Sequence, residues 1–203
     1  MVEVQGGDYS YTRPSPACLF DAGWRFACRY TSRTPAKNMS YDECLRLVNA
    51  GVWIVTIHQP SDGFLLEGFA RGQVAAREAL ALAEDECGMP EDRPVYYTLD
   101  FDPNPLTTAQ WDQVRSTLDG AASVTGRERV GIYGARLAVD TLVPDHAAWG
   151  WQTRSWSGVP PRWSPKAVLR QYDISTPNHR IFLCGGEVDR DVALADDFGQ
   201  WDP

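Results

Sequence analysis

Short apolar segments alternate with longer amphipathic segments along most of the 203-residue chain. The short segments have the length and composition of strands, and the longer ones repeat apolar residues every three or four positions, as helices do. The predicted strands are Gly7–Ser10, Arg25–Tyr30, Val52–Ile57, Val95–Asp100, Arg129–Tyr133, Ala148–Gln152, Ala167–Tyr172 and a very short Glu187–Asp189. The predicted helices are Pro16–Gly23, Met39–Gly51, Gly68–Cys87, Thr107–Thr125 and Arg136–Val143.

This order of strands and helices predicts an α/β fold with a parallel sheet. Up to eight strands in one chain indicate a small, partly irregular (β/α)8 TIM-like barrel, shorter than the usual ~250 residues. The helices after the sixth and seventh strands are missing, and residues 155–165 have the Trp, Ser, Gly and Pro content of a loop. The alternative, a flavodoxin-like open sheet, leaves the last three strands unexplained. We expect a single domain over residues 1–203.

The acidic composition limits the classes of molecule that this protein can bind. The 19 Lys and Arg against 27 Asp and Glu give a net charge of −8, which argues against nucleic acid and anionic lipid surfaces and leaves neutral sugar polymers compatible. The sequence has no run of 18 apolar residues and no recognisable export signal, so we expect no membrane span, and either an intracellular protein or one exported by a route that the sequence does not encode.

The cysteines and histidines indicate neither a cofactor nor a metal. The five cysteines are odd in number and lack Cys-x-x-Cys spacing, so we expect no disulfide framework and no zinc site, and most cysteines as small buried residues. The three histidines are scattered, without a partner four residues away.

Two aspartates follow the fourth predicted strand. On an extended strand Asp100 and Asp102 point to the same side, with their Cα atoms roughly 6–7 Å apart. Carboxylates that close have coupled proton affinities, and acid–base cleavage of a glycosidic bond needs one protonated and one ionised carboxyl. The structural alternative is that one aspartate caps a turn while the other is solvated.

Polar side chains recur where the other predicted strands end, which in a parallel barrel is the rim that carries active sites. Asp8 and Asp189 supply further carboxylates at this rim. Tryptophans gather near the sixth strand, where they either stack on sugar rings or fill space left by missing helices. As contacts to a substrate we expect Arg29, Tyr30, His58, Tyr133, Trp151 and Gln171.

Several short motifs, in their order along the chain, resemble a known family. They are Gly7-Asp-Tyr-Ser10, Phe26-Ala-Cys-Arg-Tyr30, Tyr96-Tyr-Thr-Leu-Asp-Phe-Asp102, Val130-Gly-Ile-Tyr-Gly134, Leu169-Arg-Gln-Tyr-Asp173 and Val188-Asp-Arg-Asp-Val-Ala193. Together they resemble the glycoside-hydrolase-like domain of actinobacteria and their phages, which is similar to the family 25 lysozymes. The resemblance spans Gly7 to about Trp201.

The resemblance implies a catalytic set of Asp8, Asp100, Asp102 and Asp189. It implies that Asp102 is the general acid, Asp100 stabilises the positive charge at the anomeric carbon or orients the substrate's acetamido group, and Asp8 and Asp189 orient the acid and raise its proton affinity. The lysozymes carry Glu at the position of Asp102, and the shorter side chain retracts the carboxyl by about one methylene. A displacement near 1 Å costs ~100-fold in rate.

Three hypotheses follow from these residues. The first is a peptidoglycan hydrolase of the N-acetylmuramidase kind, associated with a phage or a cell wall. The second is a barrel that binds wall glycan without cutting it, as a component of a virion or a wall assembly with phage structural proteins as partners. The third is a barrel enzyme of another class with His58 as base.

Overall fold

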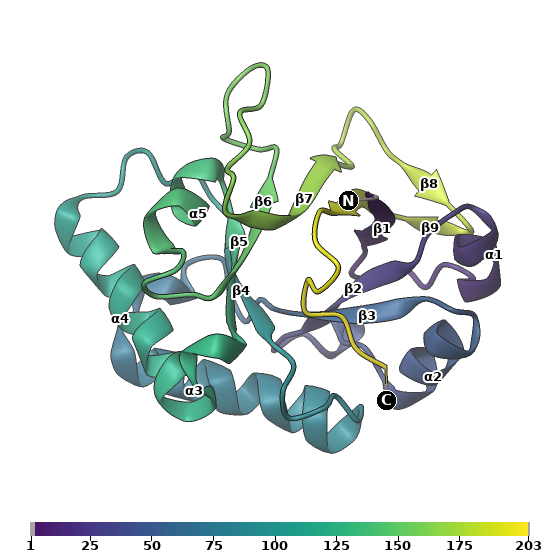
Figure 1. Ribbon diagram of the computed structural model, residues 1–203, viewed down its shortest axis with the longest axis horizontal. Helices are drawn as coiled ribbons and strands as arrows, with labels where there is room; N and C mark the ends of the chain where they lie inside the picture. The colour runs from purple at the N-terminus through teal and green to yellow at the C-terminus, as the bar shows by residue number, and fades with distance from the viewer. Residues whose placement is uncertain (1–2, 203) are drawn as a thin grey trace.

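Within residues 3–202, which the computed structural model describes, eight strands close into a barrel (Figure 1). Their order around the barrel is β1-β10-β7-β6-β5-β4-β3-β2, and the strands from β1 to β7 run parallel. The barrel strands are β1 Val4–Asp8, β2 Phe26–Thr31, β3 Trp53–His58, β4 Val95–Leu99, β5 Val130–Gly134, β6 Trp149–Thr153, β7 Ala167–Asp173 and β10 Asp189–Ala193. The predicted TIM-like barrel is confirmed.

The eighth barrel strand differs from the prediction. It is β10, which begins at Asp189 rather than ending there, and it runs antiparallel to both β1 and β7. A parallel strand needs a crossover that returns the chain to the opposite end of the barrel. Residues 174–188 instead form a loop and the hairpin β8 Phe182–Leu183 with β9 Gly186–Glu187. The chain therefore re-enters the barrel from the rim at which β7 ended.

Helices cover the parallel part of the barrel and are absent between β6 and β10, as predicted. The α-helices are α1 Pro16–Asp21, α2 Tyr41–Asn49, α3 Phe69–Leu80, α4 Thr108–Thr125 and α5 Arg136–Leu142. The short helices are η1 Pro35–Lys37, η2 Phe64–Leu66, η4 Arg127–Arg129 and the π-helical η3 Ala81–Glu86, which continues α3. Among the described residues no helix combines the length and the hydropathy that crossing a membrane requires.

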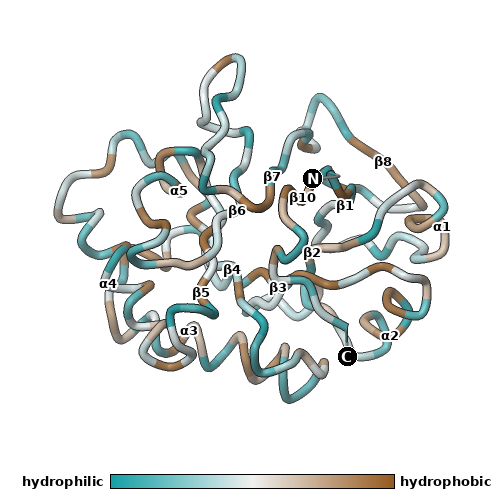
Figure 2. The backbone as a smooth tube through the Cα atoms, viewed as in Figure 1, coloured by the Kyte–Doolittle hydropathy of each residue, from teal (hydrophilic) through white to brown (hydrophobic). Residues whose placement is uncertain are grey.

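The barrel encloses its own core, separate from the one beneath the helices. Alternate residues of the strands point inward and pack as one cluster, with Trp151 as its largest fully buried member. Figure 2 shows the hydrophobic residues gathered in barrel strands such as β3, β5 and β7. At the N-terminal end of the parallel strands the C-terminal segment folds across the barrel opening. There the ring centroids of Phe198 and Phe26 are 4.9 Å apart, and the backbone of Trp201 forms an antiparallel β-bridge with that of Ile54. The opposite rim is left for a site.

A disulfide joins Cys18 of α1 to Cys184 in the turn between β8 and β9, which corrects the expectation of no disulfide. The two cysteines are 166 residues apart, and no local spacing marks such a pair. Figure 1 shows the hairpin beside α1. The other cysteines are buried and free, as predicted.

Candidate active site

Asp8 and Asp189 meet at the open rim. Asp8 is the last residue of β1 and Asp189 the first residue of β10, and the two are direct partners in the antiparallel ladder. Asp8 is also level with Cys28, which belongs to the inward-facing cluster. Neighbouring residues at the same level of a sheet share a face, so both carboxyl groups point into the barrel mouth.

A buried amide connects the two carboxyl groups to the barrel interior. The side-chain Nε2 of Gln171 donates to Asp8 Oδ2 at 2.7 Å and to Asp189 Oδ2 at 3.3 Å. The Oε1 of the same amide accepts from the hydroxyls of Tyr133 and Thr153, each at 2.8 Å. These two donors fix the orientation of the amide, so its N–H groups are held toward the carboxyl pair.

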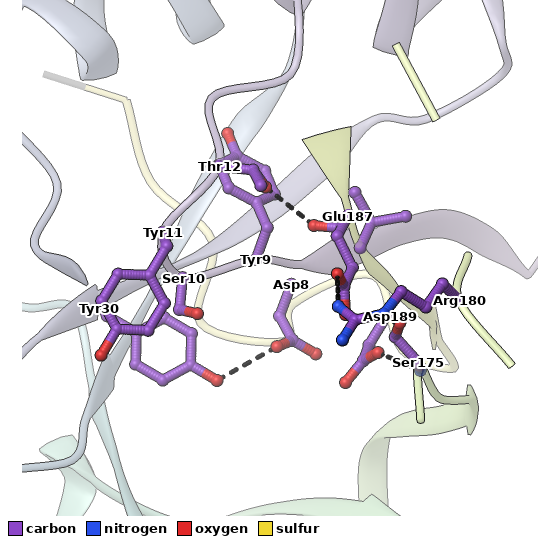
Figure 3. Close-up of a pocket in the computed structure, with 11 residues that line it drawn as sticks. Asp8, Tyr9, Ser10, Tyr11, Thr12, Tyr30, Ser175, Arg180, Glu187 and Asp189 are labelled. Atoms are coloured by element: carbon purple, nitrogen blue, oxygen red, sulfur yellow. Dashed lines mark hydrogen bonds and ion pairs between the residues drawn. The ribbon is translucent and has the colours of Figure 1, made fainter. Parts of the chain in front are cut away.

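The remaining oxygens of the pair are also hydrogen-bonded. The Tyr30 hydroxyl donates to Asp8 Oδ1 at 3.1 Å, and the Ser175 backbone N–H donates to Asp189 Oδ1 (Figure 3). Gln171, Tyr133 and Tyr30, which we expected as substrate contacts, therefore lie at this rim. Their observed role is to hold the carboxyl pair.

The pair holds a proton near neutral pH. Burial and the neighbouring Asp8 raise the pKa of Asp189 to about 8. Burial raises the pKa of Asp8 as well, and the hydrogen bonds from Gln171 and Tyr30 oppose that rise. Two carboxyl groups this close share one proton rather than ionise together.

Asp100 faces this pair from the other side of the mouth. It follows the end of β4, and β4 lies opposite β10 in the ring of strands. Asp100 is half-buried, its Oδ2 accepts from Gln59 Nε2 at 3.0 Å, and burial raises its pKa. Its charge also raises the pKa of Asp8, which places the two carboxyl groups within electrostatic range of each other.

Asp102 lies apart from this cluster. The strand ends at Leu99, so the side-by-side projection of Asp100 and Asp102 from an extended strand is wrong. Asp102 is exposed, and its Oδ1 accepts from the backbone N–H of Asn104 at 3.0 Å and from the Asn104 side chain at 2.6 Å. This is the turn-capping geometry of an aspartate before a proline-containing turn.

A pocket of about 300 Å³ opens beside the carboxyl pair. Its walls come from the loop after β1 and from the segment between β7 and β10, as Figure 3 shows. Glu187 is paired there with Arg180, accepts from the Ser175 hydroxyl at 2.8 Å and accepts at its backbone carbonyl from Thr12. The lining residues are Asp8, Tyr9, Ser10, Tyr11, Thr12, Tyr30, Ser175, Arg180, Glu187, Val188 and Asp189. Ser175 and Arg180 carry no sequence pattern that would have marked them, whereas Glu187 and Val188 fall in the predicted last strand.

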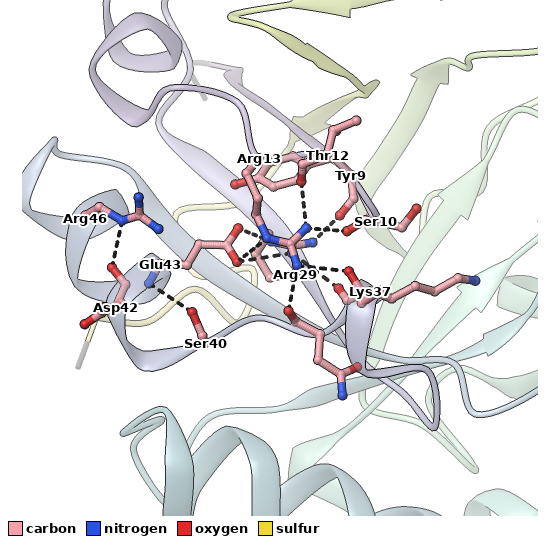
Figure 4. Close-up of polar contacts among 12 residues, drawn as sticks. Tyr9, Ser10, Thr12, Arg13, Arg29, Lys37, Ser40, Asp42, Glu43 and Arg46 are labelled. Carbon is pink, nitrogen blue, oxygen red and sulfur yellow. Dashed lines mark hydrogen bonds and ion pairs between the residues drawn. The ribbon is translucent and has the colours of Figure 1, made fainter.

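Arg29 supports the pocket from behind and is fully buried, so it is not the substrate contact that we expected. Its Nε donates to Glu43 Oε1 at 2.7 Å, its guanidinium stacks 4.3 Å from the Tyr9 ring and it also donates to the Tyr9 carbonyl (Figure 4). Arg13 forms a second ion pair with the same carboxylate, its Nε lying 3.1 Å from Glu43 Oε2. Arg29 therefore holds the loop after β1, which forms one wall of the pocket.

His58 and Trp151 are also buried away from the pocket. His58 points to the outer face of β3, where its Nδ1 lies 2.9 Å from Thr31 Oγ1 and its ring packs against Phe64 and Tyr97. Burial lowers the pKa of His58 to about 3, so it stays neutral. Trp151 is fully buried inside the barrel, and no face of its ring is open to a sugar.

A fourth carboxyl group, absent from the sequence-based set, lies below the pair. Asp191 faces inward two residues after Asp189, is fully buried, and accepts from Trp151 Nε1 at 3.0 Å. The spacing Asp189-Arg-Asp191 repeats that of Asp100 and Asp102 and was the available signal. Within the described residues no group of three metal-ligating side chains is arranged to hold an ion.

A second groove, of about 800 Å³, lies between the β6–β7 loop and the segment after β7. Trp156 lines it with 42% of its surface exposed, beside Val159 and Ile174. Trp156 has a φ of 54°, which is strained for a residue with a large side chain. Of the clustered tryptophans, Trp163 lines a separate, smaller pocket with Arg170 and Tyr172.

The closed barrel with acidic groups at one rim defines a glycoside-hydrolase-like protein. The chain belongs to the Rv2525c-like, glycoside hydrolase-like domain family, whose profile matches residues 17–193, and the resemblance drawn from the motifs is confirmed. The structure of the Tat-secreted protein Rv2525c of Mycobacterium tuberculosis in complex with L-tartrate is 26% identical, with a TM-score of 0.86 over 98% of each chain. No curated protein matches the sequence.

Lysozymes share the fold at lower identity. The bacterial lysozyme from Streptomyces coelicolor is 18% identical, with a TM-score of 0.57 over 93% of this chain and 90% of the lysozyme. The family 25 glycosyl hydrolase from Bacillus anthracis is 15% identical, with a TM-score of 0.60 over 96% of this chain and 90% of the hydrolase. At these identities the likeness is one of fold.

Proposed function

We propose that this protein hydrolyses the glycan strands of peptidoglycan, as an N-acetylmuramidase does. The observation that carries the proposal is the Asp8–Asp189 carboxyl pair, bridged by the Gln171 amide in an open pocket, opposite the carboxyl group of Asp100. A protonated and an ionised carboxyl on two sides of a bond are what glycoside hydrolysis requires. Neighbours of the same fold that are named as lysozymes and muramidases support the substrate class.

In the proposed reaction the Asp8–Asp189 pair gives its proton to the leaving glycosidic oxygen as the bond to the anomeric carbon breaks. Asp100, as a carboxylate, stabilises the positive charge that develops on the sugar ring. Water then adds its hydroxyl to the anomeric carbon, and its proton restores the pair. The resemblance assigns the acid to Asp102 instead, and the two assignments differ in which amide variant stops the reaction.

We place this activity outside the cytoplasm. The Cys18–Cys184 disulfide persists in oxidising compartments, and the M. tuberculosis relative is described as Tat-secreted. One neighbour of the same fold is the catalytic domain of an endolysin from a Listeria bacteriophage, which supports a wall-lytic role and leaves phage association as part of the proposal.

Release of reducing sugar from purified actinobacterial walls tests this function. We expect Asp189→Asn and Asp100→Asn each to lower the rate by about 100-fold or more, the usual contribution of a positioned acid or charge. Asp145→Asn is the matched control, because Asp145 is exposed and lies between α5 and the start of β6, at the end of the barrel opposite the rim. Failure of the wild-type protein to release sugar from any wall or glycan would refute the proposal.

The groove at Trp156 favours a second candidate, a module that binds wall glycan without cutting it. A partly exposed tryptophan ring beside apolar side chains is a surface on which pyranose rings stack. Trp53 is a matched control, with 41% exposure against 42% for Trp156, and it begins β3 at the other end of the barrel. Retention on walls without sugar release, lost in Trp156→Ala and kept in Trp53→Ala, would establish binding. Equal retention of the two variants would exclude Trp156 from it.

A further inference from the structure

Asp191 is a buried carboxyl group with one unsatisfied oxygen. Its Oδ1 accepts from the Trp151 indole, whereas its Oδ2 accepts a hydrogen bond from no donor within residues 3–202. It stands opposite Gly6 in the ladder, one inward-facing layer below the pair of Asp8 and Asp189. A carboxylate would leave that oxygen, and its charge, without a partner in the barrel core.

The surroundings of Asp191 disfavour ionisation. The titratable groups around it are Asp8 of β1, Asp189 of β10, Cys28 of β2 and Tyr172 of β7, and all of them are acids. An unpaired buried charge costs several kcal/mol, which a proton on the carboxyl removes. In agreement with this, burial raises the pKa of Asp191 well above its ordinary value, and Asp8 and Asp189 raise it further.

We propose that Asp191 is a permanently neutral carboxylic acid that donates its Oδ2 proton to Asp8, as a positioning residue beneath the carboxyl pair. The side chains of Asp191 and Asp8 are within hydrogen-bond range. With this donor below, and with Gln171 and Tyr30 also donating, Asp8 is the ionised member of the pair. The second proton then resides on Asp189, which lines the pocket together with Asp8.

The consequence for catalysis rests on the proposed hydrolysis, but the protonation state does not. In the inferred state three carboxyl groups, Asp8, Asp189 and Asp191, carry two protons near neutral pH. One proton is fixed in the core and one is available to a ligand. A carboxyl group kept neutral by an apolar site so that it can donate a hydrogen bond is an established device in enzymes.

Carboxyl 13C NMR of aspartate-labelled protein tests the inference without any substrate. We expect the Asp191 resonance to stay in its protonated position from pH 5 to pH 8, while the resonance of Asp189 titrates. Asp191→Asn keeps the shape of the side chain. Its amide oxygen can still accept from Trp151, and its amide N–H can still donate to Asp8. We therefore expect the titration midpoint of Asp189 to change by less than about half a pH unit, since neutral replaces neutral.

Two results would overturn the inference. One is a titration of Asp191 itself between pH 5 and pH 8. The other is a fall of one unit or more in the Asp189 midpoint in Asp191→Asn, because removal of a negative neighbour favours ionisation of Asp189.

Asp191→Leu provides a variant that removes the donor, and a thermal melt establishes that it is folded. We expect its Asp8 midpoint to rise, because Asp8 loses a hydrogen bond to its charged form, whereas the exposed Asp196→Asn leaves Asp8 unchanged. An unchanged Asp8 midpoint in folded Asp191→Leu would contradict the assignment. Should walls prove not to be a substrate, these titrations still decide the state of Asp191.

Discussion

Replacement of Asp189 by asparagine should stabilise the protein at high pH while it removes the proposed acid. In the folded chain the pKa of Asp189 is about 8, against 3.8 for the free side chain. The unfolded chain therefore loses its proton first as the pH rises, and folding becomes less favourable between about pH 4 and pH 8. Asparagine cannot ionise, so the variant escapes this loss.

The size of the effect follows from the two pKa values. A difference of about four pKa units, at about 1.4 kcal/mol each, gives an upper bound of about 6 kcal/mol at pH 8. Asp189 lines an open pocket, where solvent screening reduces the penalty, so we expect a gain of about 2–4 kcal/mol at pH 8. At pH 4 the folded side chain is neutral and the unfolded one is only about half ionised, so the gain should be below about 1 kcal/mol.

Urea unfolding followed by circular dichroism at pH 4, 6 and 8 measures this difference. The exposed Asp145→Asn serves as control and should give the same small difference at each pH. A free energy of unfolding for Asp189→Asn that does not rise relative to wild type between pH 4 and pH 8 would refute the assignment of a proton to this site. Asp189 would then be an ordinary ionised carboxylate.

Three further changes test other parts of the structure. Arg29→Leu leaves Glu43 buried without its main partner, and urea titration should show a loss of about 3–5 kcal/mol; no loss would mean that the ion pair does not hold the loop. Simultaneous replacement of Cys18 and Cys184 by serine should lower stability by about 4–5 kcal/mol, because the bond closes a loop of 166 residues, and dithiothreitol should reproduce this in the wild type but not in the variant. Asp102→Asn should release sugar from walls within about threefold of the wild-type rate, since Asp102 is exposed and caps a turn; a loss of 100-fold would return the acid role to it.

The side of each strand on which a residue lies separates the predicted site residues that lie at the rim from those that are buried away from it. In β2, Phe26, Cys28 and Tyr30 point inward, so Arg29 between them points to the helices. The prediction of His58 as a substrate contact is wrong for the same reason. Val55 and Ile57 of β3 point into the barrel, so the neighbouring His58 points outward. Strict alternation along a strand was readable in the sequence, and it would have removed both residues from the rim.

Other features depended on contacts that the sequence does not encode locally. Side chains alternate between the two faces only within a strand. Because the chain bends at Phe101, after the strand has ended, Asp102 does not point to the same side as Asp100. Asp191 was hidden because its role depends on the direction of β10, which the loop before it decides. The disulfide pairs two distant cysteines, and nothing near either of them marks its partner.

The pairing of β1 with β10 makes the site a product of the last step of closure. Asp8 and Asp189 are 181 positions apart in the sequence. They become neighbours only when the first and last strands of the barrel, β1 and β10, form their hydrogen-bonded pair. Contacts of such long range form late and slowly during folding. A partly folded chain in which β1 and β10 are unpaired therefore has no paired acids, and the hydrolysis proposed above can begin only after these two strands have joined.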